Sequence, residues 1–185
     1  MEQLDTRLPG SILLRPTVHG DARGFFQETY RADVYARLGI ADTFVQDNHS
    51  RSGRGVVRGM HFQLPPGQAK LVRCGRGEIL DVIVDIRRGS PTFGEWEGHV
   101  LSDENHHQLY VPVGFAHGFC VTSDSADVIY KCSSYYDPEI ESGIAYDDAD
   151  VGIEWPGVEL TPSPRDAAAP RLAEVADELP FEYRV

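Results

Sequence analysis

The chain has 185 residues, which is enough for one domain with a sizeable core, and residues 1–185 are predicted to form a single domain. Its formal net charge of −12 argues against general nucleic-acid binding. No apolar run approaches the roughly 18 residues of a membrane span, and the acidic N-terminus lacks the apolar core of a signal peptide. We therefore expect a cytoplasmic protein without a nucleic-acid or membrane partner.

The chain predicts many short strands and few helices. The first strand lies within residues 10–18, where a proline is typical of a sheet edge. The one clear helix before the core covers residues 31–40, because Val34 and Leu38 share a side and Gly39 marks the end. Further β-rich runs, separated by turn residues, cover 23–30, 44–50, 55–63, 69–77, 78–87, 96–102, 107–121 and 127–136. This pattern predicts a mainly β sandwich or barrel.

Two segments carry further information. In the strand at 78–87, alternation places Asp81, Ile83 and Asp85 on one face, and an acid pair beside an isoleucine is unusual for a solvated face. The opposite face is wholly apolar, with Val82, Val84 and Ile86. The tail at 161–180 has turn signals followed by a weak helix, and we expect it to fold over the β body.

Charge is uneven along the chain. Residues 1–75 carry a formal charge of +3, whereas residues 76–185 carry −15. A local arginine cluster in the first part would suit a small anionic ligand, although an accidental imbalance explains the numbers equally well.

Three cysteines are present: Cys74, Cys120 and Cys132. An odd number at wide spacing, without a CxxC pair, suits neither a disulfide framework nor a zinc site. We therefore expect buried free thiols.

Three basic residues stand in otherwise strand-like sequence between Gly55 and Val72: Arg58, His61 and Lys70. Alternation places Arg58 and His61 on opposite faces unless the strand bulges. A hairpin across "LPPGQ" would bring His61 and Lys70 onto neighbouring strands.

His117, in "PVGFAHGF", resembles the second histidine box of cupin-type barrels. Metal-binding cupins usually need a His-x-His with a downstream Glu in the first box, whereas here that box offers only His61. We therefore predict no metal site. The pair His106–His107 is typical of a solvent-facing turn.

Other candidates also have plain structural interpretations. Tyr130 suits the core or an interface, although a phenol can act as a general acid. Arg23 suits a turn, Asp81 a strand, and Asp166 could N-cap the tail helix.

The order of these segments is more specific than any one of them. "DARGFFQETY", "FVQDNHSRS", "GVVRGMHFQ", "PPGQAKLVRC", "GEILDVIVDIRRGSPTFGEW", "VPVGFAHGF", "YKCSSYYDPEIE" and "SPRDAAAP" together resemble the dTDP-4-dehydrorhamnose 3,5-epimerase family over roughly residues 5–170. The resemblance implies a cupin-type jelly-roll β-barrel with short peripheral helices, working as a homodimer without metal or other cofactor. The substrate would be a dTDP-linked 4-keto-6-deoxyhexose, inverted at C3 and C5 in dTDP-L-rhamnose biosynthesis.

The resemblance also implies catalytic roles. His61 would be the base, with Asp166 holding its tautomer and stabilising the imidazolium. Lys70 would stabilise the enolate oxygen, and Tyr130 would reprotonate the carbon from the other side. Removal of a proton beside a ketone needs such a base and such a cation, and inversion needs an acid on the opposite face.

Binding roles follow from the same resemblance. Arg58 would meet the pyrophosphate, because its planar fork suits phosphate oxygens. His117 and Asp81 would line the sugar pocket, and Glu141 matches a ligand-contacting position. The nucleotide-binding set would be Arg23, Glu28, Gln46 and Asn48, in part supplied by the second subunit.

Three alternatives remain. One is an epimerase that acts at a single carbon of a related dTDP-keto-sugar, because such relatives can retain His61, Tyr130 and Lys70. Another is a non-catalytic cupin that binds sugar nucleotides, which loss of the base or acid would favour. The last is a metal-dependent cupin oxygenase, against which the missing His-x-His argues.

Overall fold

The computed structural model describes residues 1–184 and is mainly β. The strands are β1 (Glu2–Leu4), β2 (Ile12–Arg15), β3 (Val18–Asp21), β4 (Gly24–Gln27), β5 (Gln46–Gly53), β6 (Val57–Gln63), β7 (Lys70–Arg76), β8 (Glu78–Asp85), β9 (Trp96–Ser102), β10 (Gln108–Val111), β11 (Phe115–Val121), β12 (Ser125–Cys132) and β13 (Glu141–Gly143). The helices are α1 (Ala32–Arg37), α2 (Pro164–Ala167), α3 (Leu172–Val175) and the short 3₁₀ helix η1 (Ala176–Glu178). The predicted mainly β fold with short peripheral helices is confirmed.

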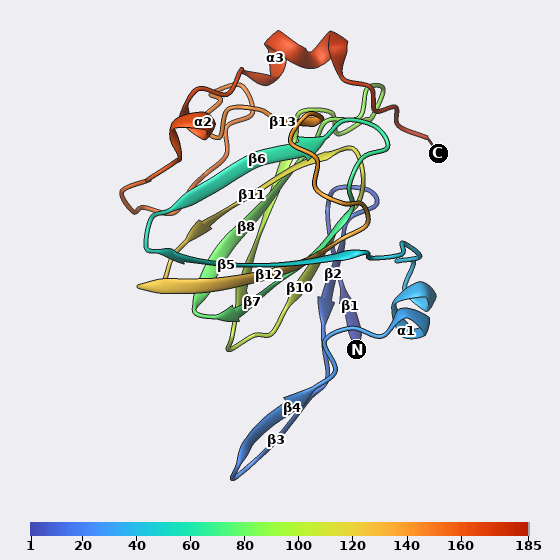
Figure 1. Cartoon of the computed structure of the whole chain (residues 1–185), viewed down its shortest axis with the longest axis vertical. Coiled ribbons are helices and arrows are strands. Elements are labelled where there is room, and N and C mark those ends of the chain that lie inside the picture. The colour runs from blue at the N-terminus through green and yellow to red at the C-terminus, as the bar shows by residue number, and fades with distance from the viewer. Residues whose placement is uncertain (185) are drawn as a thin grey trace.

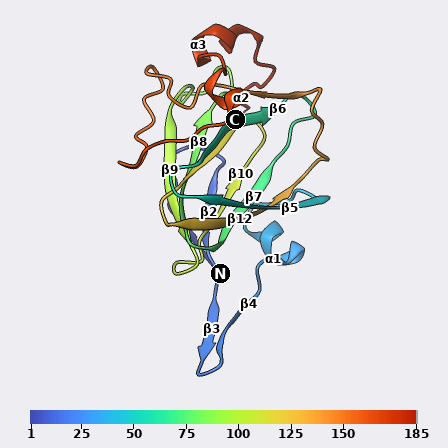
Figure 2. The same cartoon turned by 60° about the vertical axis from the view of Figure 1, so that its left-hand side comes forward.

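Two antiparallel sheets face each other as a flattened barrel (Figures 1 and 2). The six-stranded sheet has the order β1-β2-β10-β7-β12-β5, and the five-stranded sheet has the order β13-β6-β11-β8-β9. The prediction of an edge strand within residues 10–18 is wrong. β2 pairs with both β1 and β10, because residues 2–4 add a strand outside it, and Pro16 follows β2 instead of interrupting its ladder.

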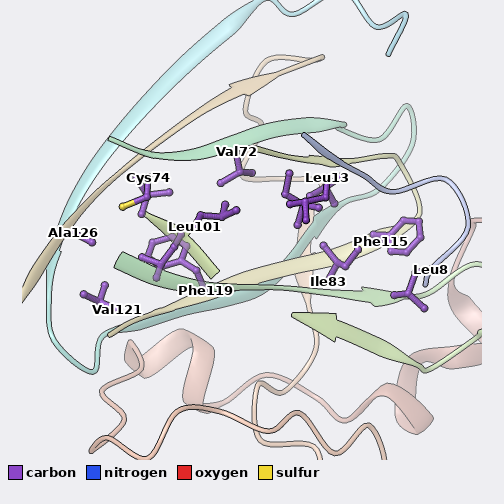
Figure 3. Packing of buried hydrophobic residues seen from close by; sticks show 14 residues of the cluster. Leu8, Leu13, Val72, Cys74, Ile83, Leu101, Phe115, Phe119, Val121 and Ala126 are labelled. Carbon is purple, nitrogen blue, oxygen red and sulfur yellow. The ribbon is translucent and has the colours of Figure 1, made fainter. Parts of the chain in front are cut away.

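The apolar core fills the space between the two sheets, as Figure 3 shows. Ile83 points into this core from β8, while Val82 and Val84 point outward, so the predicted alternation along β8 is confirmed. The residues of this core are Leu8, Leu13, Val72, Cys74, Ile79, Ile83, Leu101, Leu109, Val111, Phe115, Phe119, Val121, Ala126 and Val128.

Peripheral segments cover the outer faces of both sheets. Helix α1 buries Tyr35 against Leu14 and Leu71 of the six-stranded sheet. The C-terminal tail packs Leu172 and Phe181 over the five-stranded sheet (Figure 1). The tail therefore folds over the β body, as predicted.

One end of the barrel interior changes from apolar to polar. Along β7 the inward residues are Cys74, Val72 and Lys70, and along the antiparallel β12 they continue from Val128 to Tyr130. Because Tyr130 pairs with Val72 in the ladder, Lys70 and Tyr130 lie at the same end. The sequence thus places its polar inward residues together, in front of the packed core.

The hairpin of β3 and β4 projects away from the barrel in both views (Figures 1 and 2). Its aromatic residues Phe25 and Phe26 are 60% and 71% exposed. All three cysteines are buried and unpaired within the described range, as predicted. Among residues 1–184, no helix is long and apolar enough to cross a membrane.

Candidate active site

A cavity of about 470 Å³ opens at the polar end of the barrel. Both sheets and the C-terminal tail contribute to its lining. Seven of the predicted site residues line it: Arg58, His61, Lys70, His117, Tyr130, Glu141 and Asp166. The fold therefore gathers residues that are spread over more than half of the chain.

A β-bulge brings Arg58 and His61 to the same cavity. In the ladder with β11, His117 pairs with His61 but Phe119 pairs with Arg58, so β6 contains one extra residue. Gly59 within the bulge has a φ of +136°, and a Cβ there would lie 2.5 Å from the backbone of β11. Glycine is required at this point, and the bulge overrides the simple alternation of the strand.

His61 and Asp166 form a close pair on the cavity wall. The distance from His61 Nε2 to Asp166 Oδ1 is 2.7 Å. Because a carboxylate accepts hydrogen bonds, Nε2 carries the proton and Nδ1 is the basic nitrogen. Burial lowers the pKa of His61 below its ordinary value, although Asp166 acts in the opposite direction. The imidazole is therefore neutral at pH 7 and suited to accept a proton.

The sequence suggested Asp166 as the N-cap of the tail helix, but the structure places another residue there. The N-cap of α2 is Ser163, whose Oγ accepts the backbone N–H of Asp166 at 3.1 Å. With the cap supplied by Ser163, the Asp166 carboxylate is free to bind His61.

Lys70 reaches the cavity from the other sheet. The prediction that His61 and Lys70 lie on neighbouring strands is wrong, because β6 pairs with β11 and β13, whereas β7 pairs with β10 and β12. The turn between β6 and β7 carries the chain from one sheet to the other. Lys70 and His61 line the cavity from facing sheets. Because the Lys70 amine is buried, its pKa is lowered.

Tyr130 also lies on the six-stranded sheet, opposite His61. Burial raises the pKa of its phenol, which therefore holds its proton at neutral pH. Asn48 is its ladder partner on β5, and Gln46 donates to Asn48 Oδ1 at 2.9 Å. Gln46 and Asn48 thus lie beside Tyr130, although neither is among the residues that line this cavity.

His117 lines the cavity on β11, next to its ladder partner His61 on β6. Its Nε2 donates to Asp81 Oδ1 at 2.8 Å, and both side chains are buried. Asp81 is fully buried behind His117, so the expectation that it lines the pocket itself is wrong. Asp81 instead holds the imidazole of His117, which does line the pocket.

Glu141 is bound by two residues that the sequence reasoning missed. Arg165 forms an ion pair with its Oε2, and the Tyr136 hydroxyl donates to the same oxygen at 2.8 Å. Burial raises the pKa of Glu141, but these hydrogen bonds outweigh it and leave the pKa below its ordinary value. Arg165 precedes Asp166 in "SPRDAAAP", and Tyr136 stands in "SSYYDPE". Their location inside these two motifs is the only feature of the sequence that pointed to them as site residues.

Arg23 and Glu28 are not brought to the cavity of their own chain. Arg23 lies on the projecting hairpin, where its guanidinium binds Asp21, and Glu28 follows β4. For metal binding, residues 1–184 contain no group of three or more His, Cys, Asp or Glu side chains placed to hold an ion.

Comparison with known proteins identifies the family. A sequence model of the family dTDP-4-dehydrorhamnose 3,5-epimerase matches residues 5–174. The chain belongs to this family. It is 51% identical to the dTDP-4-dehydrorhamnose 3,5-epimerase of Salmonella typhimurium, over 91% of this chain and 94% of that protein. It is also 51% identical to the Neisseria gonorrhoeae protein of the same name, over 94% of this chain, but spans about half of that relative's length (53%).

Solved structures agree with this assignment. The dTDP-6-deoxy-D-glucose-3,5-epimerase RmlC of Legionella pneumophila, in complex with dTDP-4-keto-L-rhamnose, is 48% identical with a TM-score of 0.96. The match covers 100% of this chain and 99% of that one. The 3'-monoepimerase ChmJ of Streptomyces bikiniensis, in complex with dTDP-quinovose, is 38% identical with a TM-score of 0.87, over 94% and 89% of the two chains. The jelly-roll barrel is therefore shared by epimerases of different regiochemistry.

Proposed function

We propose that this chain is a dTDP-4-dehydrorhamnose 3,5-epimerase, which inverts C3 and C5 of dTDP-4-keto-6-deoxyglucose in dTDP-L-rhamnose biosynthesis. The observation that carries the proposal is the placement of His61 and Tyr130 on facing sheets of one cavity. Inversion at carbon requires that a proton leaves from one face of the sugar and returns to the other. A base and an acid on opposite sides of the cavity meet this requirement.

The reaction begins with proton removal beside the C4 ketone. Nδ1 of neutral His61 takes the proton from C3 or C5, and Asp166 stabilises the imidazolium that forms, through its bond to Nε2. The electron pair of the broken C–H bond moves to the C4 oxygen, giving an enolate.

Lys70 stabilises this enolate. A positive charge in a buried site acts on a developing oxyanion more strongly than the same charge in water. Tyr130, protonated because burial raises its pKa, then delivers a proton to the carbon from the face opposite His61. The phenolate regains a proton from solvent, and imidazolium releases one, so the cycle closes without change in net proton number.

The nucleotide part of the substrate is anionic, and we assign its pyrophosphate to Arg58, which lines the cavity. Its Nε donates to Ser52 Oγ at 3.1 Å, which fixes the guanidinium at the rim of the cavity. His117 positions the sugar, held by Asp81, and Glu141 adds a polar contact from β13.

The working unit that we propose is a cytoplasmic homodimer. The two exposed phenylalanines of the β3–β4 hairpin favour burial against another surface. Arg23 and Glu28 are remote from the cavity of their own subunit. In the dimer they would contribute to the nucleotide site of the other subunit, where Gln46 and Asn48 of that subunit lie. The three unpaired cysteines suit a reducing compartment.

An epimerase that acts at only one carbon is the second candidate, because the structure of a 3'-monoepimerase is closely similar. Proton NMR of dTDP-4-keto-6-deoxyglucose in D₂O with the purified protein tests both. Deuterium entering at C3 and C5 supports the double epimerase, and entry at one carbon supports the alternative. No entry at either carbon would overturn both proposals for this sugar.

A further inference from the structure

A row of acid–base side chains crosses the inner face of the five-stranded sheet. The neighbouring strands β6, β11, β8 and β9 contribute one residue each: His61, His117, Asp81 and His99. His117 is the ladder partner of His61, and Asp81 is the ladder partner of His99. The reaction described above uses the first three of these residues and leaves His99 without a role.

His99 lies beside Glu97 on the same strand, in electrostatic contact but without a hydrogen bond. Glu97, His99 and Leu101 alternate along β9, and Leu101 belongs to the core between the sheets, so all three face inward. His99 Nε2 lies 3.4 Å from Glu97 Oε1, and the two side chains are only 12% and 14% exposed. Glu97 is itself fixed, because its carboxylate accepts the backbone N–H groups of Arg7 and Leu8 at 2.9 Å.

Two atoms of this row are buried without a hydrogen bond inside the described part of the chain, residues 1–184. They are Asp81 Oδ2 and His99 Nε2. Buried polar atoms are almost always hydrogen-bonded, because an unpaired one costs free energy. Asp81 and His99 are direct cross-strand neighbours on one face, which places their side chains beside each other.

We propose that Glu97 and His99 form a positioning pair that acts on His117 through Asp81. One buried water that bridges Asp81 Oδ2 and His99 Nε2 satisfies both atoms. With Oδ2 held in this way, Oδ1 stays on the Nε2–H of His117, and His117 presents Nδ1 to the sugar as an acceptor. The inference rests on the proposed function, because it gives this pair a part in placing the same substrate.

The surroundings of His99 determine how the pair responds to pH. His99 faces Glu97 on its own strand and Asp81 on β8. His107, which precedes β10 and binds Arg15 of β2, also lies nearby. The pKa of His107 is lowered by burial, with smaller contributions from Arg15 and His99. Burial lowers the pKa of His99, although Glu97 and Asp81 oppose this effect. The neutral imidazole therefore prevails at pH 7, and protonation in acid draws the Asp81 carboxylate away from His117.

The experiment compares the wild type with His99→Leu and His99→Gln by ¹⁵N NMR of the histidine rings and by steady-state kinetics. We expect wild-type His117 to be the single Nε2–H tautomer. His99→Leu should give a mixture of tautomers and raise KM about fivefold, the effect of loosening one hydrogen bond, with kcat little changed. His99→Gln retains an N–H donor and should restore both readouts. Unchanged His117 signals and KM in His99→Leu would overturn the inference.

A matched control separates positioning from general loosening of the strand. Leu101→Ala removes a core side chain two residues along β9, so it should lower the melting temperature without moving the His117 ring signals. An equal shift in Leu101→Ala would also overturn the inference. If His99→Leu does not fold, Glu97→Gln takes its place with the same expectations. The ring spectra require no turnover, so a wild type that is inactive on the keto-sugar refutes the proposed function while the spectra still decide the role of His99.

Discussion

His61 and Asp166 are 105 positions apart in the chain, yet their side chains meet at 2.7 Å. The contact joins β6 of the barrel to helix α2 of the tail, which closes over the cavity. Part of the candidate site therefore depends on docking of the C-terminal segment, and changes in the tail should affect catalysis as well as stability.

His61→Ala should abolish proton exchange at both carbons of the keto-sugar. Loss of a general base typically reduces the rate by about 10²–10⁴-fold, and His61 is the base that we assign to both carbons. Deuterium incorporation measured by NMR checks this result. His49→Ala, at an exposed position on the outer face of β5, serves as the control and should retain activity. Near-wild-type exchange in His61→Ala would contradict the mechanism.

Asp166→Asn should alter the pH dependence in a defined direction. Asp166 raises the pKa of His61 against the dominant lowering by burial, so its neutralisation should lower that pKa further. The acid limb of kcat/KM should then move to lower pH, while the plateau falls because the imidazolium loses its stabilising charge. Asp147→Asn, at an exposed acid, should leave the profile unchanged. A limb that stays in place in Asp166→Asn would exclude direct coupling of the two groups.

Tyr130→Phe should separate exchange from inversion. Without the phenol, His61 still removes a proton and can return one to the same face, so some deuterium should enter while little inverted product forms. NMR of the substrate and product in D₂O reports both quantities in one sample. The control is Tyr135→Phe, since Tyr135 is an exposed tyrosine outside the cavity lining. Inversion at the wild-type rate would remove Tyr130 from the mechanism.

Local patterns predicted the β content, the helix at α1 and the inward face of β8, because alternation and turn residues act over a few positions. Sites that depend on long-range pairing were not predictable in this way. The extra residue in β6 that unites Arg58 with His61 becomes visible only in its register with β11. Likewise, the sheet that receives Lys70 is decided by the partners of β7, not by the length of the preceding turn.

The resemblance to a known family supplied candidates that spacing did not. It named Asp166 together with His61, whereas local sequence favoured a helix cap that Ser163 in fact provides. It also named Asp81, which the fold places behind His117 instead of on the cavity wall. Motif membership thus identified the residues, and only the structure distinguished direct contact with the cavity from support behind it.

Arg87→Ala should destabilise the fold without touching the cavity. Arg87 pairs with the fully buried Asp85 at 2.7 Å, and removal of one partner of a buried pair costs about 3–5 kcal/mol. Burial raises the pKa of Asp85, but hydrogen bonds from Arg87, Ser90 and Thr92 outweigh it and hold that pKa below its ordinary value. The stabilisation is therefore present above about pH 4, the ordinary range for aspartate, and is lost as pH falls through the lowered pKa.

Thermal unfolding between pH 7 and pH 3 checks this prediction. The wild type should lose stability in acid, and Arg87→Ala should start lower and lose less over the same range. Arg88→Ala, at the next position but with a more exposed side chain, is the matched control and should change little. Equal melting temperatures for Arg87→Ala and Arg88→Ala would show that the Asp85 pair contributes nothing measurable.

Phe25→Ser with Phe26→Ser should convert the proposed homodimer into a monomer. Both rings are exposed on the projecting hairpin, and burial of a phenylalanine side chain contributes about 1.5–3 kcal/mol, so loss of four rings from a two-fold interface removes much of the association energy. Light scattering coupled to gel filtration measures the mass directly. Since Arg23 lies in the turn of this hairpin and Glu28 follows it, KM for the dTDP-sugar should rise in the same variant. The control is Val100→Ser, at an exposed position on the barrel strand β9, which should change neither the mass nor KM. A Phe25/Phe26 double variant that remains dimeric with an unchanged KM would refute the shared nucleotide site.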